Sequence, residues 1–264
     1  MFYINKKQKK VLFVATVVKT HINVFHLPYL EMFKNKGFKT YVCAKNDFEN
    51  KEDCVIPYCD EYYDVPFERS PFNFKNIQAY RKLKKIIEKE KFDIIHCHTP
   101  VASILTRIAA IKTRKSGTKV VYTAHGFHFF KGAPLINWLI YYPIEKICSY
   151  FTDVLITINK EDYNLAMKKM KANKIYYVPG VGFDTNKFFN TKVDRIKKRK
   201  EFGLNEDNVM ILSVGELNTN KNHEVIIRAI SNIKRDDIHY FIAGEGKLKE
   251  YLYKLSEELG IKNK

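Results

Sequence analysis

The sequence lacks a long hydrophobic run and a leader segment. Its longest apolar stretches, residues 11–18 and the region around 133–144, fall well short of the roughly 20 residues that a membrane-spanning helix needs. The first ten residues, MFYINKKQKK, contain no apolar core of the kind found in signal peptides. We therefore expect a cytoplasmic protein, and any contact with a membrane should be peripheral.

Several common site motifs are also missing. The five cysteines form no C-x-x-C pair, which argues against a zinc knuckle and a disulfide framework. Neither G-x-x-x-x-G-K-[ST] nor G-x-G-x-x-G occurs, so a P-loop and a dinucleotide fingerprint are excluded. The G-x-S-x-G elbow of many serine hydrolases is absent as well.

Positive charge is present in excess, with a formal net charge of +17 among 264 residues. A basic surface attracts phosphates, nucleic acid or an anionic membrane leaflet. The alternative explanation is compositional, because Lys, Asn, Ile, Tyr and Phe are all frequent. No basic–aromatic motif of a known nucleic-acid module appears, so nucleic acid is not an expected partner.

Short β-branched runs alternate with longer amphipathic segments, a pattern that predicts βαβ units and a parallel sheet. The fold class that follows is α/β with doubly wound, Rossmann-like sheets. The expected strands are nearly continuous apolar runs, as in strands covered on both faces: residues 11–18, 39–44, 93–97, 119–124, 153–158 and 174–178. Helical patterns cover residues 24–36, 76–90, 100–115, 134–150 and 160–171.

A second strand–helix series follows the loop VPGVGFDTNKFF (178–189) and a charged helix over residues 192–203. We place the domain boundary near residue 185, which gives a first domain of residues 1–185 and a second of residues 186–264. A doubly wound sheet has about 5–6 strands on average, so the second domain is expected to be incomplete. Its predicted strands are 209–215 and 239–244, and its predicted helices are 222–234 and 247–260.

Loops at the carboxyl ends of parallel strands bind the ligands of open sheets. His125 directly follows a strand and precedes Gly126, which favours a place in a cleft over one in the core. Lys221 precedes a helix and is either a phosphate contact or one more solvated lysine. The other candidates on this predicted edge are His21, His98, His128, Gly180, Gly182, Gly215, Glu216, Gly244 and Gly246.

A metal site is not predicted. His96 and His98 lie two residues apart and share one face of their strand. However, a third ligand at a supporting spacing does not appear in the sequence.

Six segments occur in a characteristic order along nearly the whole chain: DIIHCHTP (93–100), VVYTAHGFHFF (120–130), TDVLITIN (152–159), VPGVGFDTNKF (178–188), ILSVGELNTNKNHEVIIRAI (211–230) and FIAGEGKLKEYL (241–252). Together they resemble family 4 glycosyltransferases of the GT-B fold. The resemblance is greatest to bacterial enzymes of capsule, exopolysaccharide and lipid-linked glycan assembly.

The resemblance implies a first domain that binds the acceptor and a second that holds a nucleotide-sugar, with retention of anomeric configuration and no cofactor or metal. By position, His125 would contact the donor sugar near the reacting carbon, and Lys221 would neutralise the departing diphosphate. Gly180 and Gly182 would shape the hinge loop. The remaining implied assignments are Gly215, Glu216, Gly244 and Gly246 on the donor side, and His21, His98, Gly126 and His128 on the acceptor side or cleft.

The sequence departs from the family in three respects. Residues 16–21 read TVVKTH where many members have a glycine pair, and Glu216 replaces an arginine that would bind phosphate. The paired-glutamate motif of the second domain, together with the helix that returns to the first domain, does not occur in these 264 residues. We therefore expect a fragment of a longer enzyme.

The expected function is transfer of a hexose or N-acetylhexosamine from a UDP-linked donor to a lipid-linked or polysaccharide acceptor. Two alternatives stay open, a non-catalytic binding module without the donor-site glutamates and a sugar-nucleotide epimerase of similar fold. The aromatic helix with Trp138, Tyr141 and Tyr142 suits a peripheral approach to an anionic membrane. Core packing is nevertheless the favoured role of these three side chains.

Overall fold

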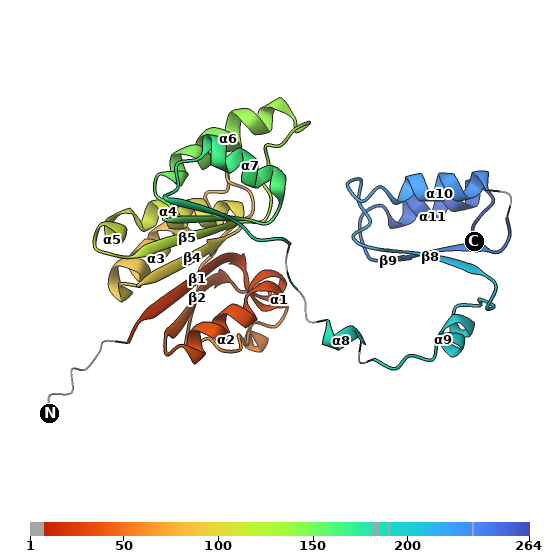
Figure 1. The fold of residues 1–264 in the computed structure, drawn as a ribbon, viewed down its shortest axis with the longest axis horizontal. Coiled ribbons are helices and arrows are strands. Elements are labelled where there is room, and N and C mark those ends of the chain that lie inside the picture. Colours follow the sequence, from red (N-terminus) through yellow and green to blue (C-terminus); the bar gives the residue numbers. More distant parts are fainter. Residues whose placement is uncertain (1–7, 181, 183–184, 190, 234) are drawn as a thin grey trace. The chain divides into compact units, whose positions relative to one another are not determined.

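A computed structural model describes residues 8–180, 182, 185–189, 191–233 and 235–264. The chain folds as two compact units, residues 1–183 and 184–264 (Figure 1). The assignment of residues 1–185 to an acceptor side and 186–264 to a donor side remains a prediction.

The first unit contains a seven-stranded parallel sheet in the order β3-β2-β1-β4-β5-β6-β7. This arrangement confirms the predicted doubly wound α/β fold, because the chain starts in the middle of the sheet, builds one edge and then returns to build the other. The strands are β1 (Lys10–Val17), β2 (Lys39–Lys45), β3 (Glu61–Asp64), β4 (Ile94–His98), β5 (Lys119–Ala124), β6 (Val154–Thr157) and β7 (Lys174–Tyr177).

Helices cover both faces of this sheet (Figure 1), which is why its central strands are apolar throughout. In β1, Leu12 and Val14 belong to the core cluster that also contains Leu83, Ala102 and Ala166 from three different helices. Phe13 and Ala15 point to the opposite face and share a cluster with Leu30 of α2. The helices are α1 (Asn23–Phe25), α2 (Leu27–Asn35), α3 (Lys75–Glu90), α4 (Pro100–Ala109), α5 (Ile111–Lys115), α6 (Leu135–Ser149) and α7 (Lys160–Lys169).

Several local features differ from the sequence-based expectation. Strand β3 was not predicted, because its end residues are exposed and its sequence EYYD has no apolar run. The expected helix 24–36 is divided at His26 into α1 and α2, and 100–115 is divided at Ala110 into α4 and α5. A π-helical turn, Val18–Ile22, follows β1. The predicted loop 178–189 contains the short helix α8 (Asn186–Phe189), and its residues 181, 183 and 184 lie outside the described part.

The second unit has a two-stranded parallel sheet of β8 (Val209–Val214) and β9 (Ile238–Ala243). Helices α10 (His223–Asn232) and α11 (Lys249–Glu258) lie on one side of it (Figure 1), and α9 (Arg195–Glu201) precedes β8. Its small core consists of Leu217, Ile227, Leu252 and Leu255.

Candidate functional site

The crevice of the first unit lies at the carboxyl ends of β1 and β4. After β1 the chain adds β2 and β3 on one side of the sheet, and from β4 onward it adds strands on the other side, so the order of strands switches between β1 and β4. Thr16 of β1 and Thr99 after β4 join the two loops, with their hydroxyl oxygens 2.7 Å apart. The Thr16 amide also donates to the Thr99 hydroxyl at 3.2 Å. Thr99 has a positive φ of 61° and precedes Pro100, the first residue of α4. A non-glycine residue in this strained conformation is typical of a functional crevice.

A pocket of about 340 Å³ opens at this crevice. The hydroxyls of Thr16, Thr20 and Thr99 border it together with one permanent cation, Arg69. His21 and His128 complete its polar wall, and Tyr141 of α6, on which His128 stacks at 4.7 Å, lies beside them. The Thr20 hydroxyl donates to the Asp47 carboxylate and the Thr99 hydroxyl donates to the His98 carbonyl, so the Arg69 guanidinium is the group of this pocket that suits an anionic ligand.

Four histidines meet at one side of this pocket, which His21 borders: His21, His26, His98 and His125. One ring nitrogen from each lies within 4.8 Å of the others. His26 and His98 are almost fully buried and their rings are 3.8 Å apart. His125 Nε2 lies 3.4 Å from His98 Nδ1. The neighbouring His96 is occupied differently, because its Nε2 is 2.8 Å from the Thr123 hydroxyl.

Burial holds these imidazoles in their neutral form. It lowers the pKa of His21 to about 4, with smaller contributions from His125 and Arg69. It lowers the pKa of His26 to about 2, assisted by the other histidines, and burial also lowers the pKa of His98 and of His125. A neutral imidazole has one nitrogen that donates a hydrogen bond and one with a free lone pair.

His125 is positioned by the turn that follows β5. Gly126 has a φ of +136°, a conformation that side chains rarely adopt, so a glycine is needed there. The Phe127 amide then donates to the buried Asp162 carboxylate of α7 at 3.0 Å. Burial raises the pKa of that carboxyl group. The half-buried His125 is therefore held at the crevice by a strand on one side and an anchored loop on the other.

The predicted donor-side residues gather at the carboxyl ends of β8 and β9. A Cβ atom at Gly244 would lie 1.9 Å from the Gly215 carbonyl oxygen, and one at Gly246 would lie 2.5 Å from that of Leu217. The alkyl chain of Lys221 packs over Gly215, where a Cβ would sit 3.6 Å from its carbons. The turn between residues 218 and 221 is stabilised by a hydrogen bond, in which the Lys221 amide donates to the Asn218 side-chain oxygen at 3.0 Å. Gly244 and Gly246 allow two backbones to approach closely, and the donor-binding role of the glycines in this turn stays a prediction.

The two charged side chains of this turn, Lys221 and Glu216, are exposed. Lys221 has no carboxylate partner in the described part of the chain, so its ammonium group is free to meet an anion. Glu216 places a negative charge in the same turn.

The structure brings three predicted residues, His21, His98 and His125, into one cluster, and His128 borders the adjoining pocket. Gly180 has a φ of +60° and its amide donates to the Ile158 carbonyl at 3.1 Å, while Gly182 is exposed. The hinge role of both glycines stays a prediction.

Sequence reasoning missed His26 and Arg69. His26 follows His21 by five residues, a signal that was available, but only the π-helical turn makes the two rings adjacent at 5.0 Å. Arg69 comes from the loop before α3 and carried no recognisable signal.

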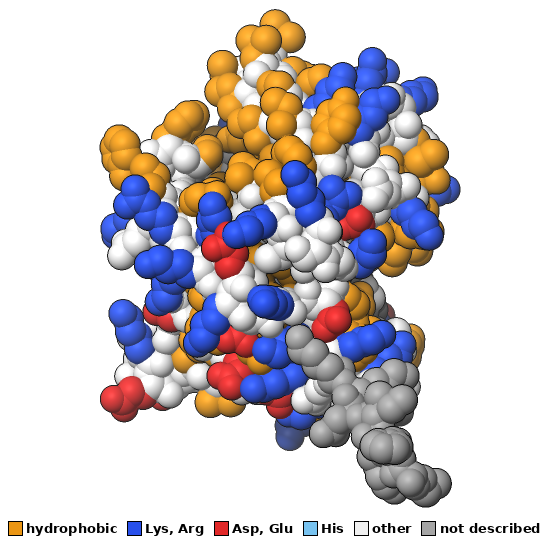
Figure 2. All heavy atoms as spheres, turned by 90° about the vertical axis from the view of Figure 1, so that its left-hand side faces the viewer, with side chains coloured by type: hydrophobic (Ala, Val, Ile, Leu, Met, Phe, Trp, Pro, Cys, Tyr) orange, Lys and Arg blue, Asp and Glu red, His pale blue; other side chains and the backbone are white. Residues whose placement is uncertain are grey.

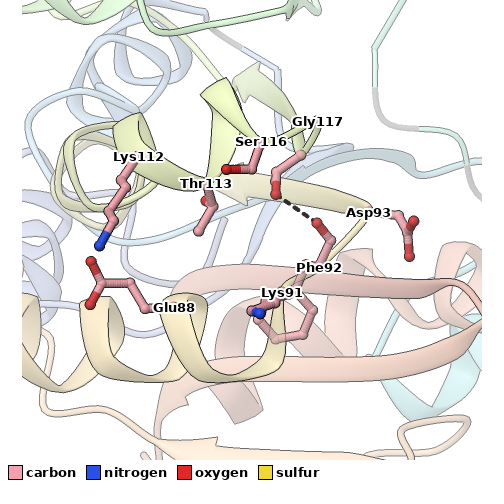
Figure 3. A pocket seen from close by; sticks show the side chains of 9 residues that line it. Glu88, Lys91, Phe92, Asp93, Lys112, Thr113, Ser116 and Gly117 are labelled. Atoms are coloured by element: carbon pink, nitrogen blue, oxygen red, sulfur yellow. Dashed lines mark hydrogen bonds between the residues drawn. The ribbon is translucent and has the colours of Figure 1, made fainter.

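A larger cavity of about 590 Å³ lies at the opposite edge of the same sheet (Figure 3). It is bordered by Lys91 and Asp93 before β4, and by Ser116 and Gly117 before β5. The Thr118 hydroxyl donates to the Phe92 carbonyl there at 2.7 Å. Because these are the amino ends of the strands, this cavity is not where the fold binds ligands.

Two protein families match the chain. The glycosyl transferase 4-like family matches residues 10–159, and the glycosyl transferases group 1 family matches residues 194–264. The chain is 42% identical to the protein named as glycosyltransferase EpsD of Bacillus subtilis, over 96% of its own length and 65% of the relative's. It is 31% identical to the Escherichia coli UDP-Gal:alpha-D-GlcNAc-diphosphoundecaprenol alpha-1,3-galactosyltransferase, over 72% of the chain and 50% of that enzyme.

Solved structures share the fold at low sequence identity. The lipopolysaccharide outer core galactosyltransferase WaaB has a TM-score of 0.62 at 15% identity, covering 96% of this chain and 66% of its own. A UDP-GlcNAc 2-epimerase from Neisseria meningitidis has the same TM-score and identity, covering 94% and 69%. The likeness confirms the GT-B fold class but does not separate transferases from epimerases. The two family matches and the identity to EpsD make that distinction, and by them the chain belongs to the glycosyltransferase 4-like family.

Proposed function

We propose that this chain contributes the acceptor side and part of the donor side of an enzyme that transfers a sugar from a nucleoside-diphosphate donor, expected to be UDP-linked, to a lipid-linked glycan. The observation that carries the proposal is the position of His125, a neutral imidazole at the strand-end crevice beside a pocket that contains Arg69. The E. coli relative, whose name specifies a UDP-sugar and a diphosphoundecaprenol-linked acceptor, supports this substrate class.

The acceptor pocket combines polar and apolar parts in the way that a lipid diphosphate requires. The Arg69 guanidinium suits the diphosphate. Pro71 also borders a second cavity of about 580 Å³, which is lined mainly by apolar side chains: Phe72, Phe74, Ile77, Tyr80, Leu105 and Ile108. In this proposal the second cavity receives the first part of the lipid chain.

His125 acts on the donor sugar. As the bond to the diphosphate breaks, positive charge develops at the sugar carbon, and a neutral imidazole does not repel it as an imidazolium would. Burial, which lowers the pKa of His125, keeps that ring neutral. We propose that it orients a sugar hydroxyl through one ring nitrogen, and that the reaction retains anomeric configuration without a cofactor.

Lys221 is the proposed partner of the departing diphosphate in the second unit. A free ammonium group stabilises the charge that develops on the leaving group. Glu216 lies in the same turn and opposes this effect, so Lys221 acts with less help than an arginine at position 216 would give.

A peripheral membrane contact through α6 is part of the proposal. No helix within the described residues is both long and apolar enough to cross a bilayer. Trp138, Tyr141 and Tyr142 pack against the core, as favoured from the sequence. Leu135 and Leu139 of the same helix are instead 81% and 72% exposed. Figure 2 shows one face of the molecule, and hydrophobic side chains gather on its upper part beside Lys and Arg side chains. This combination is suited to an anionic bilayer. We place the activity at the cytoplasmic face.

The test uses purified chain, radiolabelled UDP-sugars and vesicles that contain an undecaprenyl-diphosphate-linked sugar. We expect transfer by the wild type and a loss of about 10²–10³-fold for His125→Gln, the range found when one transition-state contact is removed. His239→Gln, a substitution in β9, is the matched control. Equal transfer by His125→Gln would contradict the role of His125.

The two alternatives give different results in the same assay. An epimerase converts the UDP-sugar without any acceptor, which product analysis detects. A binding module yields no transfer, and calorimetry with UDP then distinguishes a donor-binding chain from one that binds no donor.

A further inference from the structure

The histidine cluster contains several buried polar atoms without partners. Both ring nitrogens of His26, and the Nε2 atoms of His21 and His98, have no hydrogen-bond partner among the described residues. A buried polar group without a hydrogen bond costs about 1–3 kcal/mol. Three adjacent residues with such atoms therefore form an expensive arrangement, and a metal ion would relieve part of it by binding imidazole lone pairs.

The geometry of the cluster fits one metal ion. Ligands about 2.0–2.1 Å from a tetrahedral centre lie roughly 3.3 Å apart. His125 Nε2 and His98 Nδ1 are 3.4 Å apart. The full set of four nitrogens spans no more than 4.8 Å, so small rotations of the rings would bring all four to one centre.

The positions of the four imidazole rings are also compatible with one shared metal ion. The His21 ring centroid lies 5.0 Å from that of His26 and 5.1 Å from that of His125. His26 and His98 form the buried floor, whereas His21 and His125 are half-buried and His21 borders the pocket. An ion could therefore enter from the pocket and meet the two buried ligands last.

We propose that His21, His26, His98 and His125 bind a divalent transition-metal ion of the Zn²⁺ class. Neutral imidazole suits Zn²⁺, Cu²⁺, Ni²⁺ and Fe²⁺, whereas Mg²⁺ and Ca²⁺ prefer oxygen ligands. This revises the sequence-based expectation of no metal site, which considered His96 and His98 only. His96 is not part of the site, because its Nε2 is engaged by the Thr123 hydroxyl.

The surroundings of the four histidines limit their affinity for the metal ion. Metal-binding histidines usually donate their second N–H to a carboxylate or carbonyl, and loss of such a partner costs about 10–100-fold in affinity. His26 has no such acceptor in the described structure, whichever nitrogen it uses for the ion, and His98 has none at Nε2 when it binds the ion through Nδ1. We therefore expect binding that is stoichiometric but weaker than that of a typical zinc enzyme.

The experiment titrates the metal-free full chain with Co²⁺ and with Zn²⁺. A four-coordinate Co²⁺ site gives intense visible absorption, and we expect it to saturate at one equivalent and to disappear when Zn²⁺ is added. His26→Gln and His98→Gln should each weaken Zn²⁺ binding by more than about 100-fold, since even an outer partner is worth 10–100-fold. His239→Gln should bind as the wild type does.

Folding of each variant is checked by the fluorescence of Trp138, the single tryptophan of the chain. Should the two buried variants not fold, His21→Gln at the half-buried rim provides the same comparison and should likewise lose the Co²⁺ absorption. Absence of one-to-one binding by the wild type, or equal binding by wild type and all folded cluster variants, would overturn the proposal.

Discussion

The Arg107 guanidinium and the Glu145 carboxylate form a bidentate pair inside the first unit, with contacts of 2.9 and 3.0 Å. The pair joins α4, which begins at the crevice, to α6, which bears the exposed aliphatic face. Both side chains are buried, and Arg107 also stacks over the Tyr122 ring at 4.2 Å. The helix α4, which starts after Thr99, is therefore held against α6 by a buried ion pair.

Removal of one partner of this pair should strongly destabilise the first unit. Glu145→Gln leaves the Arg107 charge buried without its counter-ion, which costs about 3–5 kcal/mol. Arg107→Met combined with Glu145→Leu should cost much less, because no charge stays behind. Urea unfolding followed by Trp138 fluorescence measures both, as Trp138 lies in α6. A double variant as unstable as Glu145→Gln would contradict this explanation.

Stability of the first unit should fall in mild acid because of its buried histidines. Burial lowers the pKa of His21 from 6.5 to about 4, that of His96 to about 3 and that of His26 to about 2. Well above pH 6.5 neither the folded nor the unfolded state protonates these groups to a significant extent. As the pH falls from 6.5 toward 4, the unfolded chain binds protons that the folded chain excludes, so the free energy of unfolding decreases.

The measurement is the urea midpoint of Trp138 fluorescence at pH 8, 6 and 5. We expect the midpoint to drop steeply below pH 6.5, and His26→Gln to show a shallower drop because one titrating group is gone. A midpoint independent of pH across this range would mean that the imidazoles are solvated in the folded state.

The central strands were predictable because burial on both faces requires an uninterrupted apolar sequence. β3 was not predictable in this way, since Glu61 and Asp64 at its ends are exposed and the pattern of a covered strand is lost. The histidine site was predictable in part. His98 and His125 could be placed because each ends or follows a strand, and the parallel sheet brings such positions together.

The rest of the site depends on irregular backbone. His26 reaches the cluster only because a π-helical turn and a break at its own position change the direction of the chain after β1. Arg69 arrives from the loop before α3, whose path follows from no periodic pattern. The donor-side assignment of Gly215, Gly244 and Gly246 stays a prediction, and what the structure adds is that Gly244 and Gly246 let two backbones meet.

Substitution at Gly244 tests that packing. Gly244→Ala would place a Cβ 1.9 Å from the Gly215 carbonyl oxygen, so the ends of β8 and β9 must separate. We expect a loss of about 1–3 kcal/mol, typical of overpacking. Faster hydrogen exchange of the β8 and β9 amides is the readout. Gly182→Ala is the control, because a Cβ there meets nothing within 4 Å.

The exposed face of α6 should determine binding to vesicles. Leu139→Asp introduces a charge at a side chain that is 72% exposed, so folding is spared while insertion into the bilayer interface is opposed. Sedimentation with vesicles that contain anionic lipid should show reduced binding of this variant. Tyr251→Asp, an exposed position of α11, is the matched control. Equal sedimentation of the wild type and Leu139→Asp would remove α6 from the membrane contact.

Zn²⁺ should inhibit sugar transfer, a prediction that rests on both the proposed reaction and the proposed metal site. An ion held by four imidazoles takes the lone pair of His125, and that ring can no longer orient the donor sugar. Micromolar Zn²⁺ should therefore lower the rate and a chelator should restore it, whereas Mg²⁺ should have no such effect because it prefers oxygen ligands. His26→Gln, with each protein normalised to its own rate without metal, should need a much higher Zn²⁺ concentration for the same inhibition. Equal inhibition of both proteins would place the inhibitory ion elsewhere, even if the spectroscopic titration detects the four-histidine site.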